Sequence, residues 1–146
     1  EHALIRNGEL KTFLHNSSTA SYFDTATTAN GTRGPRSTLG VGIHQLVIQA
    51  GNASREELVT GEYLEITDLT GLHSGANAIS GNFSFGAAGF LCKDGERIQP
   101  VRQITVAGNF FEMLKQIRLI GDLQHWNWSR SCLMPSIRFS DVAISG

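Results

Sequence analysis

Cysteine is scarce in this sequence of 146 residues. The two cysteines, Cys92 and Cys132, are too few for a disulfide framework, and their spacing matches no local zinc-binding motif. A chain with so few cysteines is typical of a reducing compartment. We therefore expect a cytoplasmic protein.

Charged residues are also few, and neither sign dominates. They make up 17% of the chain, and the formal net charge is −1. Arginine and lysine occur singly rather than in a basic stripe that could neutralise a run of phosphates. Direct binding to nucleic acid is therefore not expected.

Long apolar runs are missing as well. No run approaches the roughly 20 residues that cross a bilayer, so we expect no membrane association. No charged and then apolar leader precedes a cleavage site. The sequence begins at Glu1 without a methionine and enters a strand pattern almost at once, which suggests a piece of a longer protein.

One pattern favours a secreted protein instead of a cytoplasmic one. Five of the eight asparagines stand in N-x-S/T sequons, which are typical of secreted glycoproteins. These are Asn16, Asn30, Asn52, Asn82 and Asn127. Because serine and threonine are plentiful and no leader is seen, we interpret most of these matches as coincidence.

The composition predicts one globular domain over residues 1–146, since 40% of the residues are hydrophobic. Alternating apolar residues indicate at least six strands, and helical spacing is confined to short segments. We predict a mostly β fold, α+β by strict count. It would be an antiparallel barrel- or sandwich-like sheet with two or three short helices.

Two tight hairpins are expected. Asn7-Gly8 and Asp94-Gly95 are two-residue loops of the kind that accept positive φ. The first would place Arg6 opposite Glu9. The second would place Lys93 opposite Glu96 and Leu91 opposite Ile98. A terminal strand is expected over residues 137–144.

Three short helices have recognisable starts. Ser17 could cap a turn through Phe23, and Ser54 with Glu57 has capping-box spacing. Asn109 could cap a third helix, in which apolar residues recur at helical spacing as far as Ile117. Residues 25–42, rich in threonine, glycine and asparagine without periodicity, are expected to form a long loop.

Residues 71–89 contain five glycines, at a density that indicates bulges, tight bends or the close approach of another backbone. Exposed edges of these strands could add an extended peptide as a further strand. His73 lies in the most glycine-rich turn, where its side chain could contact such a peptide or simply complete the turn. Asn77, Ser80 and Asn82 are further candidate substrate-binding residues of this segment.

Three segments in this order resemble the C-terminal region of the TldD/PmbA family, also called modulators of DNA gyrase. They are NASREELVTGEYLEITDLTG (52–71), SGNFSFGAAGFLCKDGERIQPV (80–101) and QITVAGNFFEMLKQIRLIGDL (103–123). In that family a GxxSxEEL helix leads into a strand, a turn leads into a GxxGF hairpin, and an ITxAGN strand leads into a helix. The resemblance runs from about Gly40 to the C-terminus.

The resemblance implies a zinc metallopeptidase about three times longer than this chain. Its N-terminal domain would carry an HExxxH helix with two zinc-binding histidines and a catalytic glutamate, and neither is present here. In the catalytic TldD branch a C-terminal cysteine is the third zinc ligand. Cys132 stands at the matching place, so it is a candidate metal ligand as well as a candidate buried core residue.

The residues after Cys132 depart from the catalytic branch, where a glycine-rich CGKxGQ-like stretch follows the cysteine. Here Leu133-Met134-Pro135 follows and the chain soon ends, which resembles the PmbA branch, also called TldE. Members of that branch commonly lack the HExxxH ligands and pair with a TldD subunit. This chain alone is therefore expected to be inactive and to bind no zinc.

The expected function is to help form the peptide-binding cleft and dimer interface of such a peptidase. The partner would be a TldD-like subunit or a second copy, and the substrate a peptide. The alternative is a non-catalytic interaction or scaffold domain. Trp126 and Trp128 fit an interface and a packed core equally well.

Overall fold

The computed structural model describes residues 2–146, in which eleven strands and three short helices are present. The strands of the large four-stranded sheet pair in antiparallel fashion, and so do the strands of the hairpins outside it. The prediction of a mostly β fold with short helices is confirmed. No helix in the described part is both long and apolar enough to cross a membrane.

The chain groups into two compact units. The first unit is Glu1–Val47 with Asn127–Cys132, and the second is Ile48–Trp126 with Leu133–Gly146. The prediction of a single domain stays a prediction.

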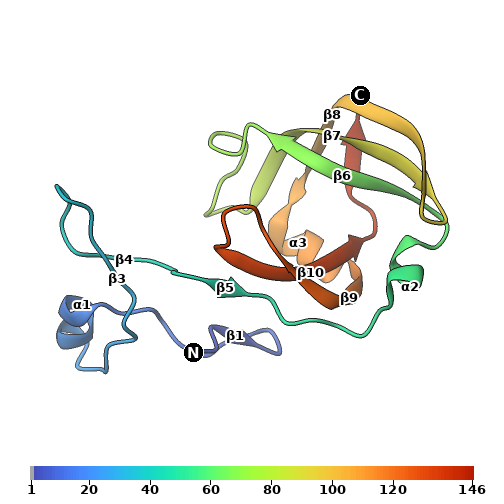
Figure 1. Ribbon diagram of the computed structural model, residues 1–146. Coiled ribbons are helices and arrows are strands. Elements are labelled where there is room, and N and C mark those ends of the chain that lie inside the picture. The colour runs from blue at the N-terminus through green and yellow to red at the C-terminus, as the bar shows by residue number, and fades with distance from the viewer. Residues whose placement is uncertain (1) are drawn as a thin grey trace. The chain divides into compact units, whose positions relative to one another are not determined.

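The first unit consists of short elements (Figure 1). They are β1 (Ile5–Arg6), β2 (Glu9–Leu10), α1 (Ser17–Tyr22), β3 (Gly31–Thr32), β4 (Gly40–Val41) and β5 (Leu46–Val47). The Asn7-Gly8 hairpin is confirmed: φ is 54° at Asn7 and 78° at Gly8, and Arg6 pairs with Glu9. The predicted loop over 25–42 instead contains the β3–β4 hairpin, because strands of two residues have no periodicity to detect.

Helix α1 begins one residue earlier than predicted. Asn16, not Ser17, is the N-cap: its side-chain oxygen accepts a hydrogen bond from the Thr19 N–H at 2.8 Å. Its amide also donates to the Gly40 carbonyl at 3.1 Å, and only 3% of its surface is exposed. Asparagine can do both because its side chain combines an acceptor with a donor.

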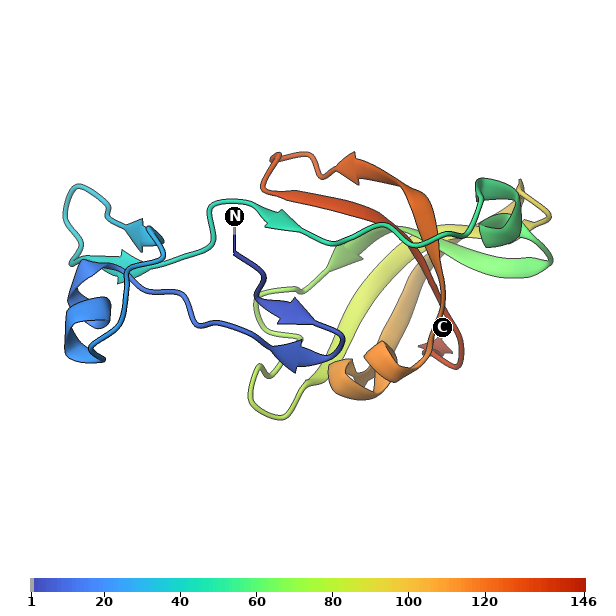
Figure 2. The same ribbon diagram turned by 90° about the horizontal axis from the view of Figure 1, so that it is seen from below.

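The second unit contains the large sheet. Its elements are α2 (Arg55–Val59), β6 (Glu62–Thr70), β7 (Asn82–Lys93), β8 (Glu96–Asn109), α3 (Phe110–Lys115), β9 (Ile117–Trp126) and β11 (Ala143–Ser145). Strand β10 (Cys132–Phe139) enters this unit at Leu133. The order in the main sheet is β11-β8-β7-β6, and β9 pairs with β10 (Figure 2). Helix α2 has the predicted capping box between Ser54 and Glu57.

The Asp94-Gly95 hairpin joins β7 to β8 and pairs Lys93 with Glu96 as predicted. The predicted pair of Leu91 with Ile98 is wrong, since a bulge places Leu91 opposite Gln99.

Strand β7 is hydrogen-bonded on both sides, to β6 and to β8. The prediction that its glycines lie on an exposed edge is therefore wrong. At Gly89 an added Cβ would lie 1.9 Å from the Glu65 carbonyl oxygen, so this glycine permits the close approach of β6. The edge strands of the main sheet are β6 and β11, and the pairing of β6 with β7 shifts by a bulge between Ile66 and Asp68.

Helix α3 is shorter than predicted. It ends at the C-cap Gln116, and Ile117 begins β9 opposite Phe139. Local helical spacing predicted a helix as far as Ile117, two residues beyond the observed end, but Ile117 pairs with β10 instead. The predicted strand over 137–144 is divided at Asp141, where φ is 56°.

Arg138 on β10 joins the β9–β10 pair to the edge of the main sheet. Its guanidinium donates to the carbonyls of Leu58 at 3.0 Å, Thr60 at 2.6 Å and Glu62 at 3.2 Å. It also lies 5.4 Å from the centre of the Tyr63 ring. One side chain thus satisfies main-chain acceptors at the end of α2 and the start of β6.

We expect Gly89→Ala to destabilise the protein by at least about 2 kcal/mol, because the new methyl group would meet a main-chain oxygen that no side-chain rotation can move. Gly31→Ala is the matched control, since its Cβ would meet nothing closer than 3.5 Å. Urea unfolding of both variants measures the difference, and equal stabilities would contradict the role of Gly89.

Candidate functional site

The loop between β6 and β7 positions most of the predicted substrate-binding residues. Gly71 leaves β6 with φ of 81°, and Gly81 enters β7 with φ of 78°. Between them the side-chain oxygen of Asn77 accepts hydrogen bonds from the N–H groups of Ile79 and Ser80, each at 2.9 Å. Asparagine stabilises turns in this way, so Asn77 shapes the loop itself.

Asn109 connects this loop to α3. Its side-chain amide donates to the Ser80 carbonyl and to the Asn82 side-chain oxygen, both at 2.8 Å. Its own oxygen accepts from the N–H groups of Phe111 and Glu112, as the predicted N-cap. The structure therefore brings Asn77, Ser80 and Asn82 together beside the start of the helix.

His73 is not part of this network. It is exposed in the same loop, and its ring makes no hydrogen bond with the described residues. A side chain so placed is available to a ligand from solvent. Its predicted contact with substrate stays a prediction.

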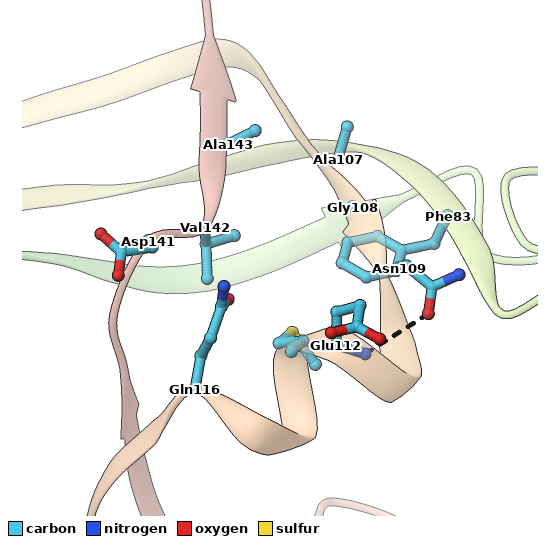
Figure 3. Close-up of a pocket in the computed structure, with 10 residues that line it drawn as sticks. Phe83, Ala107, Gly108, Asn109, Glu112, Gln116, Asp141, Val142 and Ala143 are labelled. Atoms are coloured by element: carbon cyan, nitrogen blue, oxygen red, sulfur yellow. Dashed lines mark hydrogen bonds between the residues drawn. The ribbon is translucent and has the colours of Figure 1, made fainter.

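A cavity of about 150 Å³ lies beside Asn109 (Figure 3). Main-chain and side-chain atoms of β7, β8, α3 and the segment that leads into β11 line it. The lining residues are Phe83, Ala107, Gly108, Asn109, Glu112, Met113, Gln116, Asp141, Val142 and Ala143. Apolar walls with amide and carboxylate groups suit binding through apolar contact and hydrogen bonds.

A charged cluster crosses one face of the main sheet. The Arg97 guanidinium on β8 donates to both carboxylate oxygens of Glu65 on β6, at 2.7 and 3.2 Å. It also lies 4.2 Å from the centre of the Phe90 ring on β7. The cluster thus links three adjacent strands by a bidentate ion pair and a cation–π contact.

The pKa values in this cluster follow from its contacts. The hydrogen bonds from Arg97 hold the pKa of Glu65 below its ordinary value of 4.5. Burial, and then the contact with the Cys92 thiol, raises the pKa of Tyr63 above 10.0. Cys92 has no exposed surface, so it is a packing residue rather than an accessible nucleophile.

Cys132 is partly buried, and its backbone is held by Asn127. The Asn127 side-chain oxygen accepts from the Cys132 N–H at 3.1 Å, and the Cys132 carbonyl accepts from the Asn127 N–H at 2.9 Å. Among residues 2–146 no three histidine, cysteine or acidic side chains gather closely enough to hold a metal ion. Cys132 could supply one ligand at most, whereas a catalytic zinc takes three protein ligands.

Two features of this region were not predicted from the sequence. The second role of Asn109, as donor to the loop, carries no sequence signal because its partners lie 27 and 29 residues away. Gln116 and Asp141 at the cavity were missed because the predicted helix and the predicted terminal strand ran through them.

The comparisons with known proteins agree with this architecture. The family model of the PmbA/TldA metallopeptidase C-terminal domain matches residues 1–146. The chain belongs to the PmbA/TldD family.

Similar proteins carry PmbA and TldE names. A "Metalloprotease PmbA homolog" from Buchnera aphidicola subsp. Baizongia pistaciae (strain Bp) is 33% identical, over 95% of this chain and 30% of its own length. TldE from Thermococcus kodakarensis superposes with a TM-score of 0.84 at 31% identity, over 98% of this chain and 33% of that one. These names agree with the predicted resemblance to the PmbA branch.

A protein described as a modulator of a DNA gyrase, from Thermotoga maritima MSB8, superposes with a TM-score of 0.81 at 35% identity. The match covers 97% of this chain and 32% of that one. The chain therefore spans about a third of the length of these PmbA/TldD proteins.

Removing the Asn109 side chain should break hydrogen bonds both to the start of α3 and to the loop between β6 and β7. We expect Asn109→Ala to destabilise the protein by about 1–2 kcal/mol, since it removes the cap and two further hydrogen bonds. Asn109→Ser keeps a capping oxygen and should lose less. Urea unfolding measures both, and equal losses would show that the cap contributes nothing.

The Glu65–Arg97 pair should make stability depend on pH. Because the pKa of Glu65 is lowered in the folded protein, its contribution is fully present above pH 4.5 and lost as the pH falls through the lowered pKa. We expect Glu65→Gln to be slightly less stable than wild type near neutral pH, since both side chains are partly exposed. Thermal unfolding from pH 7 to 3 should show this difference shrinking, and a constant difference would contradict it.

Proposed function

We propose that this domain helps form the peptide-binding cleft and the dimer interface of a PmbA/TldD-type metallopeptidase or of its non-catalytic partner subunit. The partner would be a TldD-like subunit or a second copy, in the cytoplasm. Zinc would be held mainly by residues of the full-length assembly outside this chain. Family membership and the metalloprotease names of relatives support the reaction class.

The observation that carries the peptide-binding role is the edge of β6. The Glu62 carbonyl faces away from β7 and accepts a hydrogen bond from Arg138. Main-chain groups alternate along a strand, so those of Leu64, which precedes the bulge, face the same way, where no strand of the described residues pairs with β6. These groups could bind an extended peptide without reading its side chains.

The neighbouring loop would border this peptide. His73, Asn77, Ser80 and Asn82 belong to the loop and strand start that follow β6 in the chain. The fixed Asn77 and Asn109 hydrogen bonds would hold the loop's shape, and the free His73 ring would be the side chain available for contact.

The strand-addition proposal is tested in the full-length protein with its partner subunit. Leu64→Pro removes an outward N–H from an edge strand, where proline is tolerated, and Leu64→Val is the control that keeps this N–H. We expect weaker binding of an unstructured peptide to the proline variant only, with unchanged metal content and circular dichroism. Equal binding by both variants would refute the role of this edge.

The location of the metal chemistry has a separate test. The isolated 146-residue chain should hydrolyse no peptide when zinc is added, because a catalytic zinc needs more protein ligands than residues 2–146 bring together. Activity that disappears with EDTA would overturn the non-catalytic assignment. In the full-length assembly, zinc content unaltered by Cys132→Ser would exclude Cys132 as a ligand, and a full-length assembly that neither binds zinc nor cleaves peptides would favour the scaffold alternative.

A further inference from the structure

We propose that Asn7 is a site of spontaneous deamidation in the folded protein, and that Asn30 is protected from the same reaction. Both asparagines precede a glycine, in the only two Asn-Gly pairs of the sequence. The local chemistry is therefore matched, and the fold alone distinguishes them.

The reaction needs only water. The backbone nitrogen of the following glycine loses its proton and attacks the side-chain carbonyl carbon of asparagine. A new C–N bond forms, the bond to the side-chain nitrogen breaks, and ammonia leaves with that proton. Water then opens the cyclic imide at either carbonyl and gives aspartate or isoaspartate. Glycine favours the attack because it has no side chain to hinder its nitrogen, and asparagine is a thermolabile residue.

Asn7 is free to reach the reactive geometry. It is exposed, and no hydrogen bond to its side chain occurs among residues 2–146. An added Cβ at Gly8 would meet nothing within 4 Å, so the space around the turn is open. The flanking strands β1 and β2 have two residues each and form a sheet of their own, and so small a hairpin opens readily in water.

Asn30 is held by three hydrogen bonds. Its side-chain amide donates to the Gly42 carbonyl at 3.0 Å, its N–H donates to the His15 carbonyl at 3.3 Å, and its carbonyl accepts from the Gly42 N–H at 3.0 Å. Gly31 belongs to β3 and pairs with Val41. The attack would require these contacts to break, so the reaction at Asn30 can proceed only after local unfolding.

The products would change the hairpin. Aspartate adds a negative charge close to Glu9, which pairs with Arg6 across the turn. Isoaspartate adds a backbone atom to a loop that fits two residues, so the pairing of β1 with β2 is lost.

Ageing the whole protein at mildly alkaline pH tests the proposal. Trypsin cleaves after Arg6, Lys11 and Arg33, so the two asparagines appear on separate peptides. Mass spectrometry follows the replacement of amide by carboxylate at each, and electron-transfer fragmentation identifies isoaspartate. The same measurement in urea gives the rate ratio of the unfolded chain. Asn7→Gln is the control, because glutamine lacks the five-membered imide route.

The expected result is a ratio of the Asn7 rate to the Asn30 rate that exceeds the unfolded ratio by at least about tenfold. In Asn7→Gln, the tryptic peptide of residues 7–11 should keep its mass under the same conditions. A smaller excess, or modification of the glutamine variant at the wild-type rate, would overturn the proposal.

Discussion

The close approach of β6 to β7 at Gly89 is the constraint on which the second unit depends. The Glu65 carbonyl oxygen occupies the space that any side chain at position 89 would need. This contact brings Glu65 into register with Phe90 and within reach of Arg97. β6 is an outer strand of the main sheet, and β7 is its one neighbour there.

Two side chains extend this arrangement beyond the sheet. Arg138 donates hydrogen bonds to three carbonyls between α2 and β6, so it links the hairpin of β9 and β10 to the edge strand. Asn109 performs the corresponding task at the other end of β6, where it joins the loop to α3. Both residues act through several hydrogen bonds at once, which explains how short helices are held beside a long sheet.

The proposed supporting role in a larger enzyme rests on these properties. Its buried thiol, Cys92, is packed away from solvent, and the polar groups of its loop are largely occupied by their own turn. What remains available is main-chain hydrogen bonding at an edge and a small cavity beside α3. Such features suit the proposed recognition of a peptide backbone.

The sequence by itself determined the Asn7-Gly8 hairpin, the Asp94-Gly95 hairpin, the Ser54 and Asn109 caps and the family, because these depend on neighbouring residues or on motifs in a fixed order. Tertiary structure decided where α3 ends, since Ile117 pairs with Phe139 on β10 instead of continuing the helix. It also decided that β7 and its glycines lie between two strands of the sheet. A pattern of glycines predicts the close approach of another backbone but does not indicate which strand approaches. The partners of Asn109 and Arg138 lie far away in the sequence, so only the folded chain could bring them together.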